Sequence, residues 1–353
     1  MNIPLPVRIA LITTGGTIAG VYDQTGTILM NADQSGWASG IFELRPELRT
    51  MVQIEFDSCL NVFSEDMTPA DWATLARRVA DWVNRGVTGI VISHGTDTLA
   101  YTSAALSYML PNLPIPVVIT GATRPLTAKS TDALRNLCDS IVVAAHSGLR
   151  GVYVVFASTI YVGTRVRKMA SKKRAFESIN YKAAGTVRGL NVQISNNTLL
   201  PGQVKGRFTV DTAHDPSVAF LKVYPGLDPA WIDLAVENKR AILLELYVEG
   251  AACTQEGNAH SLTESLKRAK TRGVPVFATS QQKSVLDLTR YESTSRLHRA
   301  GVISLRDMTT EAALPKLMWV LGHTSEPEQI KMIMLQNLAN EISEAASSDI
   351  LHH

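Results

Sequence analysis

Short apolar runs alternate with helical patterns along the first part of the chain, and this alternation limits the possible folds more than any other feature. Apolar runs typical of buried strands lie at Val7–Thr13, Asn61–Phe63, Gly89–Ile92, Val117–Thr120 and Val152–Phe156. Helical patterns lie between them at Ala70–Asn84, Leu99–Leu110 and Asp132–Ala145. Thr68, followed by Pro69 and Asp71, predicts the start of the first of these helices. The alternation predicts an α/β fold with a doubly wound, mostly parallel sheet, because parallel strands are joined by helical crossovers.

The pattern changes between Ser195 and Gly226, where turn signals replace sustained periodicity. Alternation resumes near Ile232. Strands are expected at Ala241–Leu246 and Val274–Ala278, and helices at Leu262–Thr271, Glu311–Trp319 and Glu328–Glu344. We therefore predict an N-terminal catalytic α/β domain over residues 1–205, a linker over residues 206–230 and a smaller C-terminal α/β domain over residues 231–353.

Composition and charge exclude several classes of protein. A hydrophobic content of 45% and a charged content of 19% are those of a soluble globular protein. The net charge of +2 gives no electrostatic reason to expect nucleic acid or a membrane as partner. No apolar run approaches the roughly 18 residues of a membrane span, and the first apolar run is shorter than the core of a signal peptide. We therefore expect a cytoplasmic protein.

Metal and disulfide chemistry are not indicated by the sequence. Cys59, Cys138 and Cys253 are odd in number and widely spaced, so free thiols are expected. The eight histidines are scattered, and no H-E-x-x-H motif occurs. The sequence thus predicts an activity that needs neither a metal nor an organic cofactor.

Two glycine–threonine loops follow predicted strands. The first strand runs into Thr13-Thr14-Gly15-Gly16-Thr17-Ile18-Ala19-Gly20, and the strand at Gly89–Ile92 runs into Ser93-His94-Gly95-Thr96-Asp97-Thr98. The first loop matches neither the dinucleotide fingerprint nor the phosphate loop that ends in Gly-Lys-Ser/Thr. A tight turn with Thr17 as a turn hydroxyl is one interpretation. Because ligands bind at the carboxyl ends of parallel strands, the two loops together favour a site with a hydroxyl nucleophile and a carboxylate.

These loops give the chain a resemblance to a known family. Together with Ser64–Thr68, Gly121–Pro125, Asp132 and Asn136, they resemble the bacterial-type L-asparaginases, the asparaginase/glutaminase family, in order and spacing over nearly the whole chain. The segment Asp66-Met67-Thr68-Pro69 is most similar to the cytoplasmic type I branch. The resemblance implies hydrolysis of L-asparagine to L-aspartate and ammonia. It also implies a homotetramer of intimate dimers, with the sites at the dimer interface.

The resemblance also implies catalytic roles. Thr17 is the implied nucleophile, which would attack the side-chain carboxamide carbon, release ammonia and leave a β-aspartyl ester for water to cleave. Thr96 is the implied second threonine, with Asp97 and a lysine as its partners. By its spacing from Arg165, Lys168 is the candidate lysine. Rival candidates in the same basic run are Lys172 and Lys173.

Substrate contacts follow from the charges of an amino acid. Asp97 and Glu65 are the implied ligands of the α-ammonium group, and Ser64 with nearby backbone N–H groups is implied for the α-carboxylate; Thr96 is also expected at the substrate. The structural alternative for Glu65 is a surface acid just before a helix N-terminus. His94 and the segment Gly121–Pro125 are interpreted as a packed loop histidine and a turn, without catalytic roles.

Two departures from the family pattern leave other functions open. Thr27 stands where the family carries a loop tyrosine, and Tyr22 is the only tyrosine nearby. Glu249 stands near the turn from which a family asparagine reaches the partner's site, and it is a possible substitute. One alternative is the tRNA-dependent amidotransferase subunit that shares this fold and releases ammonia from glutamine. Another is an amino-acid-binding sensor that has lost turnover.

Overall fold

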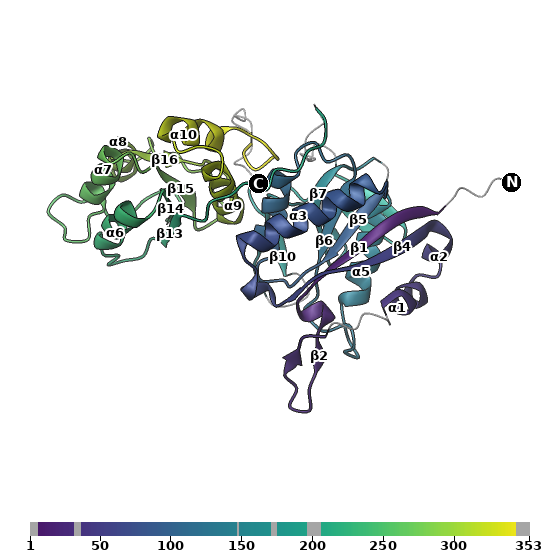
Figure 1. Ribbon diagram of the computed structural model, residues 1–353. Helices are drawn as coiled ribbons and strands as arrows, with labels where there is room; N and C mark the ends of the chain where they lie inside the picture. Colours follow the sequence, from purple (N-terminus) through teal and green to yellow (C-terminus); the bar gives the residue numbers. More distant parts are fainter. Residues whose placement is uncertain (1–5, 32–36, 147, 171–174, 196–205, 344–353) are drawn as a thin grey trace. The chain divides into compact units, whose positions relative to one another are not determined.

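The computed structural model describes residues 6–31, 37–146, 148–170, 175–195 and 206–343, and it divides into two compact units (Figure 1). The first unit covers Met1–Thr212 and the second Ala213–His353. Each contains a largely parallel sheet with helices packed on it, so the predicted α/β class is confirmed for both.

The first unit is built on an eight-stranded sheet of order β12-β11-β8-β7-β6-β5-β1-β4. Its parallel strands are β1 (Val7–Gly15), β4 (Val52–Val62), β5 (Gly89–Ser93), β6 (Pro116–Thr120) and β7 (Gly151–Phe156). Three antiparallel strands extend it: β8 (Thr159–Val162), β11 (Gly185–Arg188) and β12 (Asn191–Ile194). Small hairpins pair β2 (Val21–Tyr22) with β3 (Ile28–Leu29), and β9 (Val166–Lys168) with β10 (Phe176–Ser178).

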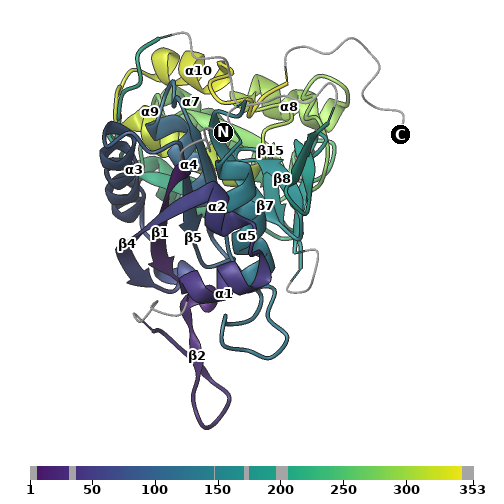
Figure 2. The same cartoon turned by 90° about the vertical axis from the view of Figure 1, so that its right-hand side faces the viewer.

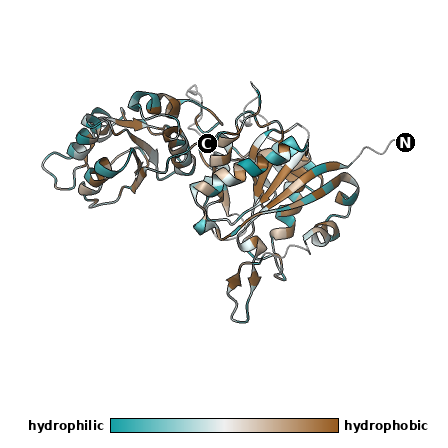
Figure 3. Ribbon diagram, in the orientation of Figure 1, coloured by the Kyte–Doolittle hydropathy of each residue, from teal (hydrophilic) through white to brown (hydrophobic). Residues whose placement is uncertain are grey.

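Helices cover both faces of this sheet. They are α1 (Trp37–Leu44), α2 (Leu48–Met51), α3 (Pro69–Asn84), α4 (Leu99–Met109) and α5 (Ala133–Ala144). On one face α1 and α5 pack with alternate strand residues such as Ile9 and Val91 into one apolar core. Figures 1 and 2 show α3 on the opposite side, where it contacts α4. Because β5 and β6 are buried on both faces, residues 89–92 and 116–119 are apolar, and only the last residue of each strand, Ser93 or Thr120, is polar (Figure 3).

The predicted start of α3 is confirmed. Pro69 is the first helical residue, and the Asp71 carboxylate accepts hydrogen bonds from the Thr68 amide at 2.8 Å and the Thr68 hydroxyl at 2.6 Å. This arrangement satisfies the Thr68 amide, one of the backbone donors that a helix leaves unpaired at its N-terminus.

The strand expected at Asn61–Phe63 is only the end of a longer strand. β4 begins at Val52 and forms an edge of the sheet, with exposed positions at Gln53, Phe56 and Ser58. A half-exposed edge strand carries polar residues at alternate positions, so it shows no continuous apolar run.

The second unit has a four-stranded parallel sheet of order β13-β14-β15-β16. Its strands are β13 (Val218–Lys222), β14 (Ala241–Leu246), β15 (Val276–Ser280) and β16 (Val302–Ser304). The helices are α6 (Ala230–Asn238), α7 (Thr263–Thr271), α8 (Glu292–Arg299), α9 (Thr310–Leu321) and α10 (Pro327–Leu335). β13 lies inside the segment 206–230 that the sequence predicts to be a linker. The apolar pattern does not reveal it because it is a partly exposed edge strand.

The helix expected at Glu328–Glu344 ends at Leu335. The chain then turns around the fully buried side chains of Lys316 and Glu341. The Lys316 ammonium group donates to the Met334 carbonyl at 3.0 Å, to Gln336 O and to the Glu341 carboxylate. The Lys316 ammonium group thus binds the last turn of α10 together with Gln336 and Glu341 beyond it, so the helical pattern of the sequence is overridden after Leu335.

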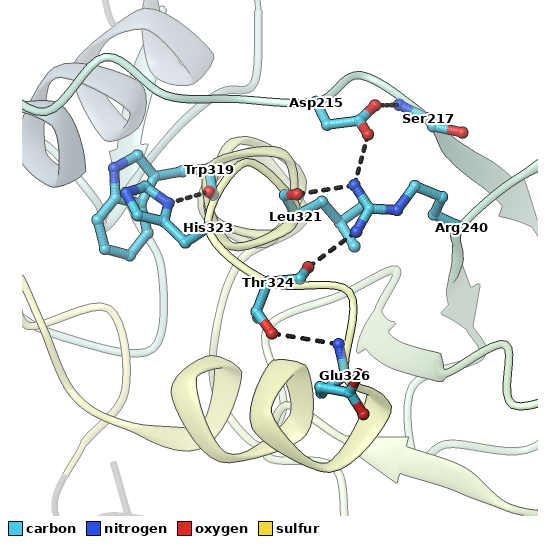
Figure 4. A network of polar contacts seen from close by, with 8 residues as sticks. All are labelled: Asp215, Ser217, Arg240, Trp319, Leu321, His323, Thr324 and Glu326. Atoms are coloured by element: carbon cyan, nitrogen blue, oxygen red, sulfur yellow. Dashed lines mark hydrogen bonds and ion pairs between the residues drawn. The ribbon is translucent and has the colours of Figure 1, made fainter.

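Arg240 joins the segment that leads into β13 to the end of α9 (Figure 4). Its guanidinium group donates to the Asp215 carboxylate at 2.6 Å, to Leu321 O at 2.8 Å and to Thr324 O at 2.8 Å. Asp215 also accepts from the Ser217 amide at 2.8 Å. Five donors in one planar group allow one side chain to hold these separate segments of the second unit.

Candidate active site

The loops after β1, β4 and β5 meet through their backbones. Gly15 and Gly16 have φ values of 99° and 75°, in the left-handed region that favours glycine. A Cβ atom at Gly16 would lie 2.4 Å from the backbone of Gly95, and a Cβ at Gly95 would lie 2.7 Å from Ser64 Oγ. The two glycine–threonine loops are thus in direct main-chain contact, as expected for the carboxyl ends of neighbouring parallel strands.

Thr17 begins the short 3-10 turn Thr17–Ala19 directly after Gly16. It is partly exposed, whereas Ile18 and Ala19 are buried. Among the residues that the structure describes, the amide N–H groups of Thr17 and Thr96 have no hydrogen-bond acceptor. Each loop therefore offers one hydroxyl group and one available amide donor.

Lys168 links Thr96 and Asp97. Its ammonium nitrogen lies 2.8 Å from Thr96 Oγ1 and 2.5 Å from Asp97 Oδ1. The Lys168 side chain is 22% exposed, the Asp97 side chain is 65% exposed, and Thr96 is buried. Pairing of β9 with β10, in which Lys168 lies opposite Phe176, fixes the lysine at the end of its strand. The rival residues Lys172 and Lys173 lie outside the described residues.

Ser64 connects the third loop to the same group of residues. Its side chain is buried, and its Oγ accepts a hydrogen bond from the Asp97 amide at 3.2 Å. Its carbonyl accepts from the Thr98 hydroxyl at 2.6 Å. Glu65 follows in the 3-10 turn Ser64–Asp66, is exposed, and has no side-chain partner in the described part of the chain.

Tyr22 and Thr27 form no hydrogen bond or ion pair with this group in the described part of the first unit. Tyr22 is 46% exposed, and Thr27 is exposed, in the β2–β3 hairpin that projects from the first unit (Figure 1). The Thr27 amide donates to the Asp23 carboxylate at 2.9 Å within the hairpin turn. Glu249 belongs to the second unit, where it forms an ion pair of 3.2 Å with Arg290.

His94 lies at the base of the second loop in a buried chain of hydrogen bonds. Its Nδ1 lies 2.7 Å from Gly95 O, and its Nε2 lies 2.9 Å from the Thr102 hydroxyl. The indole N–H of Trp72 donates to the same hydroxyl at 3.1 Å. Burial lowers the pKa of His94 to about 4, so the imidazole is neutral at neutral pH. Sequence reasoning missed Trp72 and Thr102, because on α3 and α4 they have the spacing of ordinary core residues.

The loop at Gly121–Pro125 is shaped by a carboxylate. Asp132 accepts hydrogen bonds from the Thr123 amide at 3.0 Å, the Thr123 hydroxyl at 3.0 Å and the Arg124 amide at 3.2 Å. Asn136 donates to the Gly121 carbonyl at 2.9 Å. These contacts determine the shape of the turn that follows β6.

Neither metal ligands nor disulfides are found in the part of the chain that the structure describes. Cys59, Cys138 and Cys253 are free, and no group of three or more His, Cys, Asp or Glu side chains is arranged to hold a metal ion. None of the described helices is long and apolar enough to cross a membrane.

Comparison with known proteins places these loops in a family. Residues 8–200 match the family described as "Asparaginase, N-terminal", and residues 217–334 match the "Glutaminase/Asparaginase C-terminal domain". An L-asparaginase of Thermococcus kodakarensis is 39% identical over 340 residues, which cover 96% of this chain and 99% of that protein. A solved structure of the thermostable L-asparaginase from this organism matches with a TM-score of 0.87 at 38% identity, over 96% of this chain and 100% of that chain.

Two further proteins widen the comparison. The solved L-asparaginase I of Vibrio cholerae matches with a TM-score of 0.83 at 31% identity, over 96% of this chain and 100% of that chain. A glutamyl-tRNA(Gln) amidotransferase subunit of Methanobrevibacter smithii is 34% identical over 354 residues, covering 98% of this chain and 79% of that protein. With matches in both units and both threonine loops in direct contact, this chain belongs to the asparaginase family.

Proposed function

We propose that this protein is an L-asparaginase that hydrolyses L-asparagine to L-aspartate and ammonia through an acyl-enzyme on Thr17. The observation that carries the proposal is the contact between the two threonine loops, together with the Lys168 hydrogen bond to Thr96 at 2.8 Å. L-Asparaginases from two other organisms match the chain over nearly its whole length. A threonine hydroxyl is a weak nucleophile, so a neighbouring basic group is needed for such chemistry.

The reaction we propose has two steps. Thr17 Oγ bonds to the side-chain carboxamide carbon while its proton passes to the Thr96–Lys168 pair. The pair then returns a proton to the amide nitrogen, the C–N bond breaks, and the nitrogen leaves as ammonia. Water then adds to the β-aspartyl ester, and the Thr17 hydroxyl is restored with release of aspartate. Lys168 accepts a proton only as a neutral amine, and the Thr96 hydroxyl is placed to relay it.

Charge develops on the carboxamide oxygen in both steps. The amide N–H groups of Thr17 and Thr96 have no acceptor among the described residues, so both are available to donate to this oxygen. Donors that are fixed before the reaction are worth most, because they require no reorganisation in the transition state.

Substrate orientation follows from the charges around the loops. We propose that Asp97 and Glu65 bind the α-ammonium group, since both carboxylates lie on exposed side chains next to Ser64 or Thr96. Ser64 Oγ and backbone N–H groups are proposed for the α-carboxylate. Tyr22 and Thr27 are proposed to contribute through the β2–β3 hairpin, and Glu249 through a second protomer.

A second candidate function is glutamine hydrolysis as part of an amidotransferase. It is favoured by the match to the amidotransferase subunit of Methanobrevibacter smithii, of which this chain covers 79%. Asparagine and glutamine differ by one methylene, which is typically worth only about 1–3 kcal/mol of discrimination. Because this discrimination is small, the two candidates are distinguished by comparing kcat/KM for asparagine with kcat/KM for glutamine in parallel assays.

The assembly and location belong to the same proposal. We expect a homotetramer of intimate dimers with the site completed at the dimer interface, and a cytoplasmic location. Activity per chain should then fall on dilution below the dimer dissociation constant. Constant specific activity in a demonstrated monomer would rule out a shared site.

The first experiment measures ammonia release from L-asparagine and L-glutamine by the wild type and Thr17→Ala. We expect release from asparagine, with a loss of at least about 1,000-fold in the variant, because a nucleophile cannot be replaced by a methyl group. Thr74→Ala, at an exposed position of α3, is the matched control and should retain activity. Binding of either amide by thermal shift without ammonia release would instead support a sensor.

A further inference from the structure

We propose that His94 is a positioning residue, whose Nδ1–H group holds the Gly95 carbonyl and thereby fixes the peptide that carries the Thr96 amide N–H. This inference rests on the proposed function, since it concerns the donor that meets the developing oxyanion. His94 itself is completely buried and does not act on the substrate.

The two ends of this buried hydrogen-bond chain determine which atom donates in each of its bonds. At one end the Trp72 indole can only donate, and at the other the Gly95 carbonyl can only accept. His94 Nδ1 must therefore carry the hydrogen, and Nε2 must accept from the Thr102 hydroxyl. A neutral imidazole satisfies all these groups at once, with one tautomer and no donor or acceptor left over.

The Gly95 carbonyl and the Thr96 N–H belong to one planar peptide, so fixing the carbonyl also fixes the direction of the N–H. A glycine before this peptide would otherwise leave the plane free to rotate, because glycine has the widest range of backbone angles. The backbone of His94 is itself held by a hydrogen bond of 2.8 Å from its amide to Thr120 O. The imidazole contact removes the remaining freedom of the loop.

Packing alone does not require a histidine at this position. Burying a polar ring costs free energy unless each nitrogen finds a partner, and an apolar side chain would fill the same volume without that cost. Here both nitrogens are bonded, and one bond ends on the peptide next to Thr96. The polar contact, rather than the packing, therefore accounts for the residue type.

Two substitutions distinguish the role of Nδ1 from that of Nε2. In His94→Asn the amide nitrogen lies where Nδ1 lies and can still donate to Gly95 O. In His94→Gln the polar end lies where Nε2 lies and cannot. We expect kcat for asparagine to stay within about 5-fold of wild type in His94→Asn and to fall about 100-fold in His94→Gln, with KM within about 3-fold in both.

A merely structural role predicts a different result. Both variants lose part of the buried hydrogen-bond chain, so both should have a lower unfolding temperature. If the role of His94 is only structural, kcat will follow stability and not the position of the hydrogen-bond donor. Equal kcat values in the two variants would overturn the proposal. If neither variant folds, Thr102→Val and Thr102→Ser repeat the comparison. Removal of the hydroxyl group should lower kcat about 10-fold, serine should restore it, and equal values would overturn the proposal.

A readout without catalysis separates this inference from the proposed function. In protein labelled with ¹⁵N-histidine, NMR should show the His94 Nδ1 signal as protonated and the Nε2 signal as unprotonated, with no change between pH 8 and pH 6. An Nε2–H tautomer would overturn the positioning role even in an active enzyme. A wild type that releases no ammonia but shows the Nδ1–H tautomer would overturn the proposed function and leave the geometry of His94 established.

Discussion

Mild acid should destabilise the first unit through His94. Burial lowers the pKa of this imidazole to about 4, whereas an unfolded chain titrates at about 6.5. The stabilisation from the neutral imidazole is therefore fully present above pH 6.5 and is lost as the pH falls toward 4, because the unfolded chain takes up a proton first. These two pKa values predict a loss of about 2 kcal/mol between pH 8 and pH 5, and about 3 kcal/mol at pH 4.

The assay is urea-induced unfolding at a series of pH values, for the wild type and for His94→Asn. The asparagine cannot titrate, so the wild type should lose about 2 kcal/mol more than the variant between pH 8 and pH 5. The remaining histidines of the eight in the chain are common to both proteins, and their contributions cancel. Parallel pH profiles would refute the reasoning, as would a steeper loss in the variant.

Three more substitutions test separate parts of the structure. Lys168→Met should lower turnover by about 10²- to 10⁴-fold, the usual contribution of an acid–base group, in ammonia-release assays; unchanged turnover would assign the role to another lysine. Gly16→Ala should destabilise the fold by more than about 1 kcal/mol in urea unfolding, because φ is 75° and the new Cβ would lie 2.4 Å from Gly95. Lys316→Met should cost about 3–5 kcal/mol by leaving the buried carboxylate of Glu341 without a counter-charge. A double-mutant cycle with Glu341→Gln should show strong coupling, and additive effects would contradict the pairing.

Elements that are buried on both faces are predictable from the sequence. β5, β6 and β14 are fully buried and carry only one polar residue each, and their bounds agree with the expected ones within about two residues. Edge strands are not predictable in this way, because their solvent-exposed positions carry polar residues that interrupt the apolar run. Accordingly the expected β4 is far too short, and β13 falls in the expected linker.

The candidate site is predictable where it depends on strand ends. The two loops follow the neighbouring parallel strands β1 and β5, and they meet where Gly16 contacts Gly95. The position of Lys168 depends on a hairpin that only the tertiary structure shows. The chain of Trp72, Thr102 and His94 joins three elements, so no local pattern in the sequence contains it.

The glycine contact between the two threonine loops has a consequence for temperature. Side chains change rotamer long before a folded backbone opens, but the spacing of these loops is set by main-chain atoms. Heating should therefore leave the distance between the two loops nearly unchanged until the sheet itself unfolds. Catalytic rate should accordingly rise with temperature as the chemical barrier dictates, and should collapse only at the melting transition of the first unit.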